Sequence, residues 1–288
     1  MKRLFLVLAL LASQGVYAGG PQFFVELADP QMGMFAKDRD SLQEQANLSF
    51  AVASINRLKP AFVVVCGDLV NRAGDGEEIS QYKRLMLRVD PSIPVYNVAG
   101  NHDVGNQPTE ETLAEYRKNF GRDYYTFDSG ETRGIVLDSN LIAGAQNVPQ
   151  ESRAQERWLV GELQRARREG VKHLFVFQHI PYFLEHADEP DQYFNIPLAA
   201  RRRYLDLLQR YGVECVFAGH YHRNASGRDG SIEMITSGAV GVPLGESQSG
   251  FRIVRIRPEV QSRFYDLGSI PHAIDSTASL PRCPACAE

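Results

Sequence analysis

Ile93-Pro94-Val95-Tyr96-Asn97-Val98-Ala99-Gly100-Asn101-His102-Asp103 is the stretch that decides the fold. Its first seven residues form an apolar run that predicts a buried β-strand. Gly100 permits a tight turn after that strand, and three side chains able to bind a metal or a proton follow at once. In α/β folds, chemistry is placed where strands end and loops begin. On these four residues alone, a polar turn without function is an equally good interpretation.

Strands and helices alternate on both sides of this stretch. Apolar runs predict further buried strands, and apolar residues at helical spacing predict the helices between them. The strands are expected at 23–28, 61–66, 93–99, 173–178 and 213–218, and the helices at 42–58, 79–89, 109–119, 151–168 and 198–211. An antiparallel pair is expected at 124–127 and 134–138, and later strands at 233–236, 251–256 and 260–265. This order predicts one α/β domain with parallel strands.

Polar side chains follow five of the predicted strands. The sets are Asp29/Gln31, Asp68/Asn71, Asn101/His102/Asp103, His179 and His220/His222. Because the carboxyl ends of parallel strands share one edge of a sheet, we expect these side chains to converge. Carboxylate, amide oxygen and imidazole together suit Mn, Fe, Zn or Mg. Each residue alone also has a structural interpretation, such as a turn-capping aspartate or a hydrogen-bonded core histidine, but five such strand ends together predict a metal site.

The combined order of these motifs resembles the calcineurin-like metallophosphoesterases, over nearly the whole mature chain. The resemblance is closer to one branch, the calcineurin-like phosphoesterase domain-containing proteins of animals, which are serine/threonine phosphatases. The stretches that carry it are Ala28-Asp29-Pro30-Gln31, Cys66-Gly67-Asp68-Leu69, Gly100-Asn101-His102-Asp103-Val104-Gly105-Asn106, Phe177-Gln178-His179-Ile180-Pro181 and Gly219-His220-Tyr221-His222-Arg223-Asn224-Ala225. It implies an α/β fold of four layers, an αββα sandwich with two sheets between helices.

The resemblance also implies roles for the residues at the strand ends. Asp68 is expected to bridge two divalent ions. The other ligands divide between the two ions, with Asp29 and His222 on the first and Asn101, His179 and His220 on the second. His102 is expected to donate a proton and to bind phosphate, with Asp103 as its charge partner.

Gln31 stands where most of the superfamily has histidine, and we count it among the candidate metal ligands. An amide offers only a neutral oxygen or a donor nitrogen, so the first site is expected to be weaker or to hold a harder ion. Mn or Mg is therefore favoured over Fe, with Mn preferred and Zn also open. Whether Gln31 contacts the metal stays open at this stage.

We expect a metal-dependent phosphoesterase. A hydroxide activated between two ions would attack phosphorus in line, and His102 would protonate the leaving oxygen. The substrate is expected to be a serine/threonine phosphoprotein or, as the alternative, a phosphodiester, a nucleotide or a small phosphomonoester. A rival from another class is a metal-stabilised binding protein without turnover, which Gln31 favours and Asn101-His102-Asp103 opposes. A zinc hydrolase of amides or esters is a third interpretation, and it lacks the histidine-rich helix motif of such enzymes.

The N-terminus predicts export. Lys2 and Arg3 precede an apolar run, Leu4 to Ala12, that is too short to span a bilayer. Val16-Tyr17-Ala18 has the pattern that signal peptidase reads, so cleavage is expected after Ala18. A membrane anchor or a wrongly assigned start is the alternative. We expect a signal peptide at 1–18, a phosphoesterase domain at 19–268, a tail at 269–288, and a periplasmic or secreted protein without a membrane anchor.

The net charge argues against nucleic-acid binding, and the positions of the four cysteines indicate their roles. The formal net charge is −4 and no basic run occurs, so no nucleic-acid footprint is expected. Cys66 and Cys215 lie in apolar runs and are expected to be small core residues. Cys283 and Cys286 form a C-x-x-C near the end, for which a local disulfide and a disordered tail are both open.

Overall fold

The computed structural model describes residues 23–256 and 259–274 and contains two mixed sheets. The first sheet has the order β11 (Gln261–Asp266), β10 (Gly250–Arg255), β1 (Phe23–Leu27), β2 (Val63–Val65) and β3 (Val95–Asn97). The second has the order β4 (Tyr125–Ser129), β5 (Thr132–Val136), β6 (His173–Phe177), β7 (Cys215–Ala218), β9 (Ile232–Thr236) and β8 (Ala225–Asp229). Strands β1 to β3 are mutually parallel, and so are β5, β6, β7 and β9. Both sheets therefore present a row of strand carboxyl ends.

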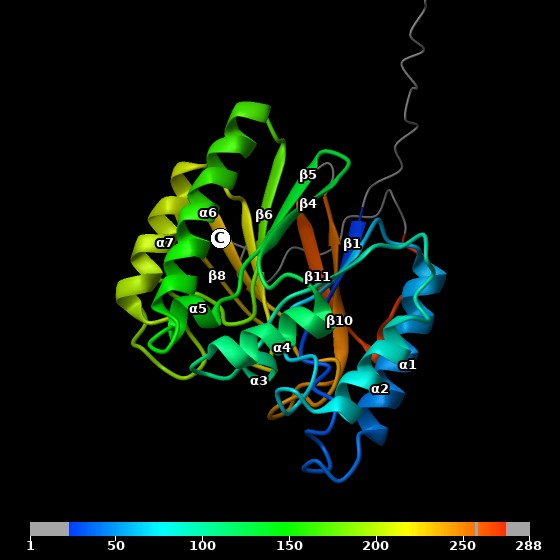
Figure 1. Ribbon diagram of the computed structural model, residues 1–288. Helices are drawn as coiled ribbons and strands as arrows, with labels where there is room; N and C mark the ends of the chain where they lie inside the picture. The colour runs from blue at the N-terminus through cyan, green and yellow to red at the C-terminus, as the bar shows by residue number, and fades with distance from the viewer. Residues whose placement is uncertain (1–22, 257–258, 275–288) are drawn as a thin grey trace, which may run out of the picture.

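Helices cover the outer face of each sheet. Helices α1 (Leu42–Leu58), α2 (Gly76–Met86) and α4 (Glu110–Phe120) share a buried cluster with alternate residues of the first sheet, such as Val25 and Leu27. Helices α6 (Pro149–Glu169) and α7 (Leu198–Arg210) pack in the same way on the second sheet, against Leu174 and Val176. Figure 1 shows the two helical groups on opposite sides of the strands. Short helices α3 (Asn101–Val104) and α5 (Asn140–Ala143) and a 3-10 turn (Leu267–Ser269) complete the description.

An aromatic cluster fills the space between the two sheets. The residues that alternate with the helix-facing ones point inward, as the two-residue period of a strand requires. The Phe24 ring of β1 lies 4.7 Å from Phe62, 5.3 Å from Phe217 and 5.7 Å from Phe177. These side chains are fully buried and lie in stacked or edge-to-face contacts. The cluster makes the two sheets one sandwich, and the expected four-layer αββα architecture is confirmed.

Strand β8 was not expected from the sequence. Its residues, Ala225-Ser226-Gly227-Arg228-Asp229, have no apolar alternation and contain a glycine, so they resemble a loop. They become a strand because they pair with β9 across a turn at Gly230 and Ser231. The boundaries of several other elements differ from the expected ones; for example, α2 begins at Gly76, where Asp75 caps it, and β5 begins at Thr132.

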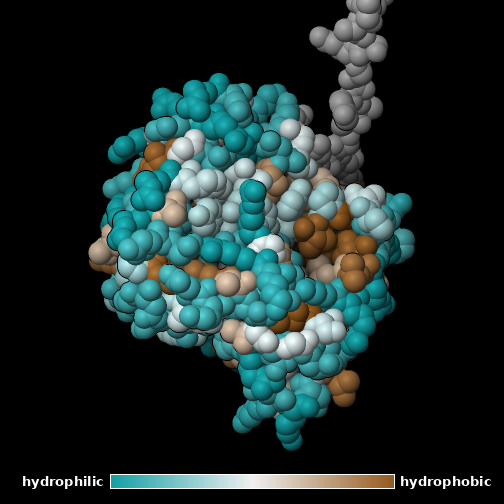
Figure 2. All heavy atoms as spheres, viewed as in Figure 1, coloured by the Kyte–Doolittle hydropathy of each residue, from teal (hydrophilic) through white to brown (hydrophobic). Residues whose placement is uncertain are grey.

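Of the remaining expectations, some are confirmed by the structure, and others concern residues that the structure does not describe. Cys66 and Cys215 are free and buried, as expected. The expected signal peptide at 1–18 and the Cys283/Cys286 pair lie outside the described residues, as does most of the expected tail at 269–288. Within the described ranges, no helix combines the length and apolar character needed to cross a bilayer. The face seen in Figure 2 is mainly hydrophilic, with apolar side chains in small groups.

Candidate dinuclear metal site

The predicted ligand residues come together at the carboxyl ends of β1, β2, β6 and β7 and at the start of α3. All seven are almost completely buried: Asp29, Gln31, Asp68, Asn101, His179, His220 and His222. Two three-residue groups have ligand atoms within 4.8 Å of one another, namely Asp68/His179/His220 and Asp29/Asp68/His222. Asp68 belongs to both groups, so its position is that of a carboxylate shared by two ions.

The two groups have different donor sets. His179 Nε2 lies 3.2 Å from Asp68 Oδ2 and 2.9 Å from Asn101 Oδ1, which adds an amide oxygen to the Asp68/His179/His220 group. In the other group, His222 Nε2 lies 3.3 Å from Asp29 Oδ1. Asn101, His179 and His220 therefore lie on one side of Asp68, and Asp29 and His222 lie on the other.

Backbone carbonyls fix the tautomer of each imidazole. His179 Nδ1 lies 2.8 Å from the Cys66 carbonyl oxygen, and His222 Nδ1 lies 2.5 Å from that of Val242. His220 is turned the other way, with Nε2 2.9 Å from the Tyr193 carbonyl oxygen. A carbonyl only accepts, so the nitrogen facing it must carry the proton. The second nitrogen of each ring is then the one available to a metal ion, which displaces any proton that this nitrogen carries.

The local backbone is unusual at the same residues. Asp29, Gln31, Asp68, His220 and His222 all have positive φ, between 38° and 69°. Non-glycine residues rarely adopt this left-handed region, and it recurs at functional sites. These turns follow directly on the ends of β1, β2 and β7.

Close packing of the strand ends explains two glycines. A Cβ at Gly67 would lie 2.5 Å from His179 Nδ1. A Cβ at Gly100 would lie 2.1 Å from the Asp68 backbone nitrogen and 2.1 Å from its Oδ1. Both distances are far below van der Waals contact, so neither position accepts a side chain without movement of a candidate ligand.

Gln31 is buried beside the site, and the structure shows a hydrogen-bonding role. Its Nε2 donates to Asn71 Oδ1 at 3.0 Å. Its Oε1 is buried and has no hydrogen-bond partner among the described residues. Buried amide oxygens are normally satisfied. The orphaned oxygen fits a hard cation as its partner, so Gln31 remains a candidate ligand of the Asp29/His222 side.

His102 and Asp103 lie at the start of α3, but they do not form the expected pair. His102 Nδ1 lies 2.7 Å from the Asn71 carbonyl oxygen. The Asp103 carboxylate instead accepts backbone N–H bonds from Leu69, Val70 and Gly100. The expectation that Asp103 is the charge partner of His102 is therefore corrected: Asp103 ties the turn after β2 to the turn after β3. His102 is half-buried, and its only side-chain hydrogen bond among the described residues is at Nδ1, so Nε2 can face a substrate.

Sequence reasoning missed Tyr193. Its hydroxyl lies 3.2 Å from Asn101 Nδ2, and its ring centroid lies 4.9 Å from that of His220. Tyr193 belongs to a long connection between β6 and α7 and follows no strand. Only the run of aromatic and acidic residues around it marked this connection in the sequence.

Comparison with known proteins identifies the family of this chain. Residues 28–224 match the family described as calcineurin-like phosphoesterase. The chain belongs to the calcineurin-like phosphoesterase family. Among curated relatives, serine/threonine-protein phosphatase CPPED1 of Bos taurus is 38% identical over 267 residues, covering 87% of this chain and 85% of the relative. The same protein of Danio rerio is 39% identical over 250 residues, covering 82% and 81%.

A solved structure shares the fold. A dimetal phosphatase from Danio rerio superposes with a TM-score of 0.62 at 17% identity, covering 86% of this chain and all of the other. Membership of the phosphoesterase family makes this chain a metal-dependent hydrolase of phosphoesters. The family uses two divalent ions, and the donor sets found here fit two.

Electrostatics favour cations at the shared carboxylate. Burial alone would raise the pKa of Asp68, but the neighbouring His179 outweighs burial and holds that pKa well below its usual range. Burial would lower the pKa of His179, but Asp68 outweighs it and raises the pKa to about 9. Burial and the charge of His179 lower the pKa of His220 to about 4. An ionised Asp68 beside a neutral His220 is a suitable pair of ligands, and an ion that binds His179 Nε2 replaces a proton there.

Gly100→Ala should disable the site without unfolding the protein elsewhere. The new Cβ would overlap Asp68, so the protein should retain fewer than two ions per chain and lose at least about 90% of its phosphatase activity. Gly161→Ala in α6 is the matched control, because nothing lies within 4 Å of a Cβ there. Elemental analysis measures the metal content of the two variants, and p-nitrophenyl phosphate hydrolysis measures their activity. Full metal content in the Gly100→Ala protein would contradict the close approach of the two turns.

Gln31→His tests whether position 31 reaches the metal. An imidazole is a stronger ligand than an amide oxygen, so the weaker of the two ions should bind roughly 10- to 100-fold more tightly, the range typical for changes around a metal site. The measurement is a Mn²⁺ titration of wild type and variant, followed by activity at each metal concentration. Two equal affinities in wild type, with no gain in the variant, would show that Gln31 only orients Asn71.

Proposed function

We propose that this phosphoesterase is an exported phosphomonoesterase that removes phosphate from serine or threonine in extended protein segments. The observation that carries the substrate class is a hollow beside the candidate metal site. It has a volume of about 640 Å³ and is lined by Leu184 to His186 on one side and by Tyr221 and residues 223–228 on the other. Two relatives named serine/threonine-protein phosphatase support the same substrate class.

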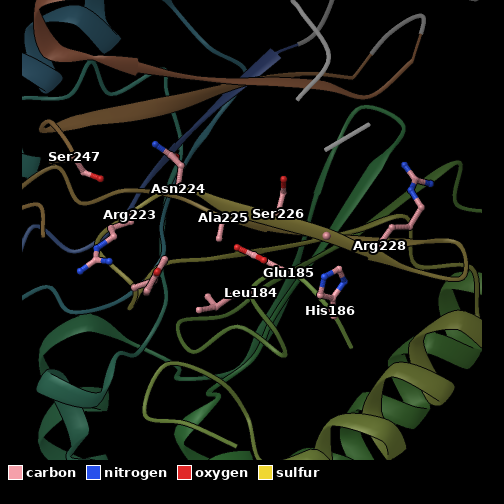
Figure 3. Close-up of a pocket in the computed structure, with 11 residues that line it drawn as sticks. Leu184, Glu185, His186, Arg223, Asn224, Ala225, Ser226, Arg228 and Ser247 are labelled. Carbon is pink, nitrogen blue, oxygen red and sulfur yellow. The ribbon is translucent and has the colours of Figure 1, made fainter. Parts of the chain in front are cut away.

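The hollow and the site share one segment of the chain. Tyr221 lies between the candidate ligands His220 and His222 and also lines the hollow. Figure 3 shows Leu184, Glu185 and His186 on one side of β8, with Arg223 and Arg228 toward opposite ends of the segment. In this proposal, the segment carrying a phosphate held at the metals runs along β8 and occupies this hollow. A small phosphomonoester would use none of this space.

Arg223 is the residue best placed to read such a segment. It is exposed, and its guanidinium lies over the Tyr221 ring, 5.2 Å from the centroid. No ion pair to Arg223 is found among the described residues. Arg228 differs, because its Nη2 lies 3.6 Å from Glu233 Oε2. The uncompensated cation near the site favours an acidic residue next to the phosphorylated one.

The residues around the metals have distinct tasks in this hydrolysis. Two divalent ions held by Asp68 and the flanking ligands would supply Lewis acidity and lower the pKa of a water molecule at neutral pH. His102 holds Nδ1–H on the Asn71 carbonyl, so its Nε2 points away from that bond and, when protonated, can deliver a proton to the leaving serine or threonine oxygen. The His102 backbone N–H donates to Asp68 Oδ1 at 2.8 Å, which ties the proton donor to the shared carboxylate. A binding protein without turnover would not require this donor.

The same proposal includes the metal and the location. We favour Mn²⁺ because Asn101 and Gln31 add neutral amide oxygens to the carboxylates and imidazoles, a mixture that suits this ion. The basic start, the apolar run and Ala18 support export to a periplasm or to the medium.

A phosphopeptide panel tests the substrate class. Wild type should hydrolyse phosphoserine peptides, and an aspartate beside the phosphoserine should raise kcat/KM over an alanine. Arg223→Gln should reduce that preference roughly 1.5- to 5-fold, the 0.2–1 kcal/mol of an exposed charge pair. Arg228→Gln should keep the preference, because Glu233 already compensates its charge. Turnover of nucleotides, phosphodiesters or p-nitrophenyl phosphate without any phosphopeptide turnover would favour the small-molecule alternative.

Export has its own test. Mass spectrometry of the protein purified from its native source should find Gly19 as the first residue, because cleavage is expected after Ala18. An intact Met1 on cytosolic protein would refute export and leave the phosphatase assignment untouched.

A further inference from the structure

Tyr193 contacts two candidate ligands of the same ion. Its hydroxyl lies 3.2 Å from Asn101 Nδ2, and its backbone carbonyl oxygen lies 2.9 Å from His220 Nε2. Its ring also packs on His220, with centroids 4.9 Å apart. Nevertheless 58% of the residue is exposed, so it lies at the surface above the Asp68/His179/His220 group. These contacts make it unlike the buried aromatic residues of the core.

Each contact selects the ligand atom that faces the ion. An asparagine side chain can turn either its oxygen or its nitrogen toward a metal, and only the oxygen binds. With Nδ2 donating to the Tyr193 hydroxyl, Oδ1 faces His179 Nε2 at 2.9 Å. With Nε2 of His220 protonated toward the Tyr193 carbonyl, Nδ1 keeps its lone pair. The hydroxyl also hydrogen bonds to Asn106, which fixes its own direction.

The connection that carries Tyr193 is held firmly. The buried Arg201 guanidinium donates to the carbonyl oxygens of Ala187, Glu189 and Ile196 at 2.7–3.1 Å. The Glu189 carboxylate accepts the backbone N–H groups of Leu184, Glu185 and His186 and the side chain of Asn195. Residues 184–196 are therefore braced on both sides of Tyr193, and its hydroxyl has a defined place although the side chain is exposed.

We infer that Tyr193 is a positioning residue for the ion of the Asp68/His179/His220 group. It acts through Asn101 with its hydroxyl and through His220 with its carbonyl. Outer contacts of this kind hold a ligand atom in the binding geometry before the ion arrives, and their loss weakens binding by roughly 10- to 100-fold. The other ion, on Asp29 and His222, has no contact with Tyr193 through a candidate ligand of its own. The inference concerns the metal site, so it does not depend on the phosphoprotein substrate.

The test is a calorimetric Mn²⁺ titration of Tyr193→Phe, followed by a count of ions retained after dialysis. The variant keeps the ring and the carbonyl and loses only the hydroxyl, so it should fold with an unchanged thermal midpoint in the metal-free state. One of its two dissociation constants should rise about 10-fold and the other should stay at the wild-type value. Tyr221→Phe is the matched control, because this tyrosine also lies beside the ligands but its hydroxyl has no hydrogen bond to any of them among the described residues.

Two results would overturn the inference. Unchanged binding of both ions by the Tyr193→Phe protein would mean that Asn101 needs no outside contact to present its oxygen. Equal weakening of both ions would mean that the substitution disturbs the site as a whole. The inference predicts that the Tyr193→Phe protein binds one of the two Mn²⁺ ions more weakly and that the Tyr221→Phe protein binds both as wild type does. A tyrosine with a merely structural role would not give this result.

Discussion

The hydrogen bond between an imidazole and a backbone carbonyl is the interaction on which this site depends. It occurs at all four histidines of the site, with the carbonyls of Cys66, Asn71, Tyr193 and Val242 as acceptors. Each bond holds a proton on the outer nitrogen and so leaves the inner one for a metal or a substrate. The carbonyls are part of the chain that follows the strands, so the fold itself determines the chemistry of the rings.

The rest of the structure holds these carbonyls and imidazole rings in their relative positions. Parallel pairing of β1, β2 and β3 brings Asp29, Asp68 and Asn101 to one edge, and β6 and β7 bring the histidines to the adjacent edge of the second sheet. The five ligand-region residues with positive φ cost about 1–3 kcal/mol each where such strain is not relieved. The aromatic contacts between the sheets and the two helical layers are the favourable terms that offset it.

Much of this arrangement could be predicted from the sequence, because strand ends carry a strong local signal. Apolar runs that end in glycine followed by aspartate, asparagine or histidine gave the parallel strands and the ligand residues together. Contacts between distant segments carry no such signal. The true partners of Asp103, the carbonyl that orients each histidine and the role of Tyr193 all depend on loops whose paths are set by packing. Strand β8 was missed for the same reason, since it exists only by pairing with β9.

The proposed hydrolysis depends on the sharing of the Asp68 carboxylate by two ions. The most direct test of this sharing is anomalous diffraction from crystals of the protein loaded with Mn²⁺. We expect two peaks about 3.5–4 Å apart, both next to the Asp68 carboxylate, one also bound by Asn101, His179 and His220 and the other by Asp29 and His222. A single peak at full loading, or two peaks that Asp68 does not connect, would contradict this expectation.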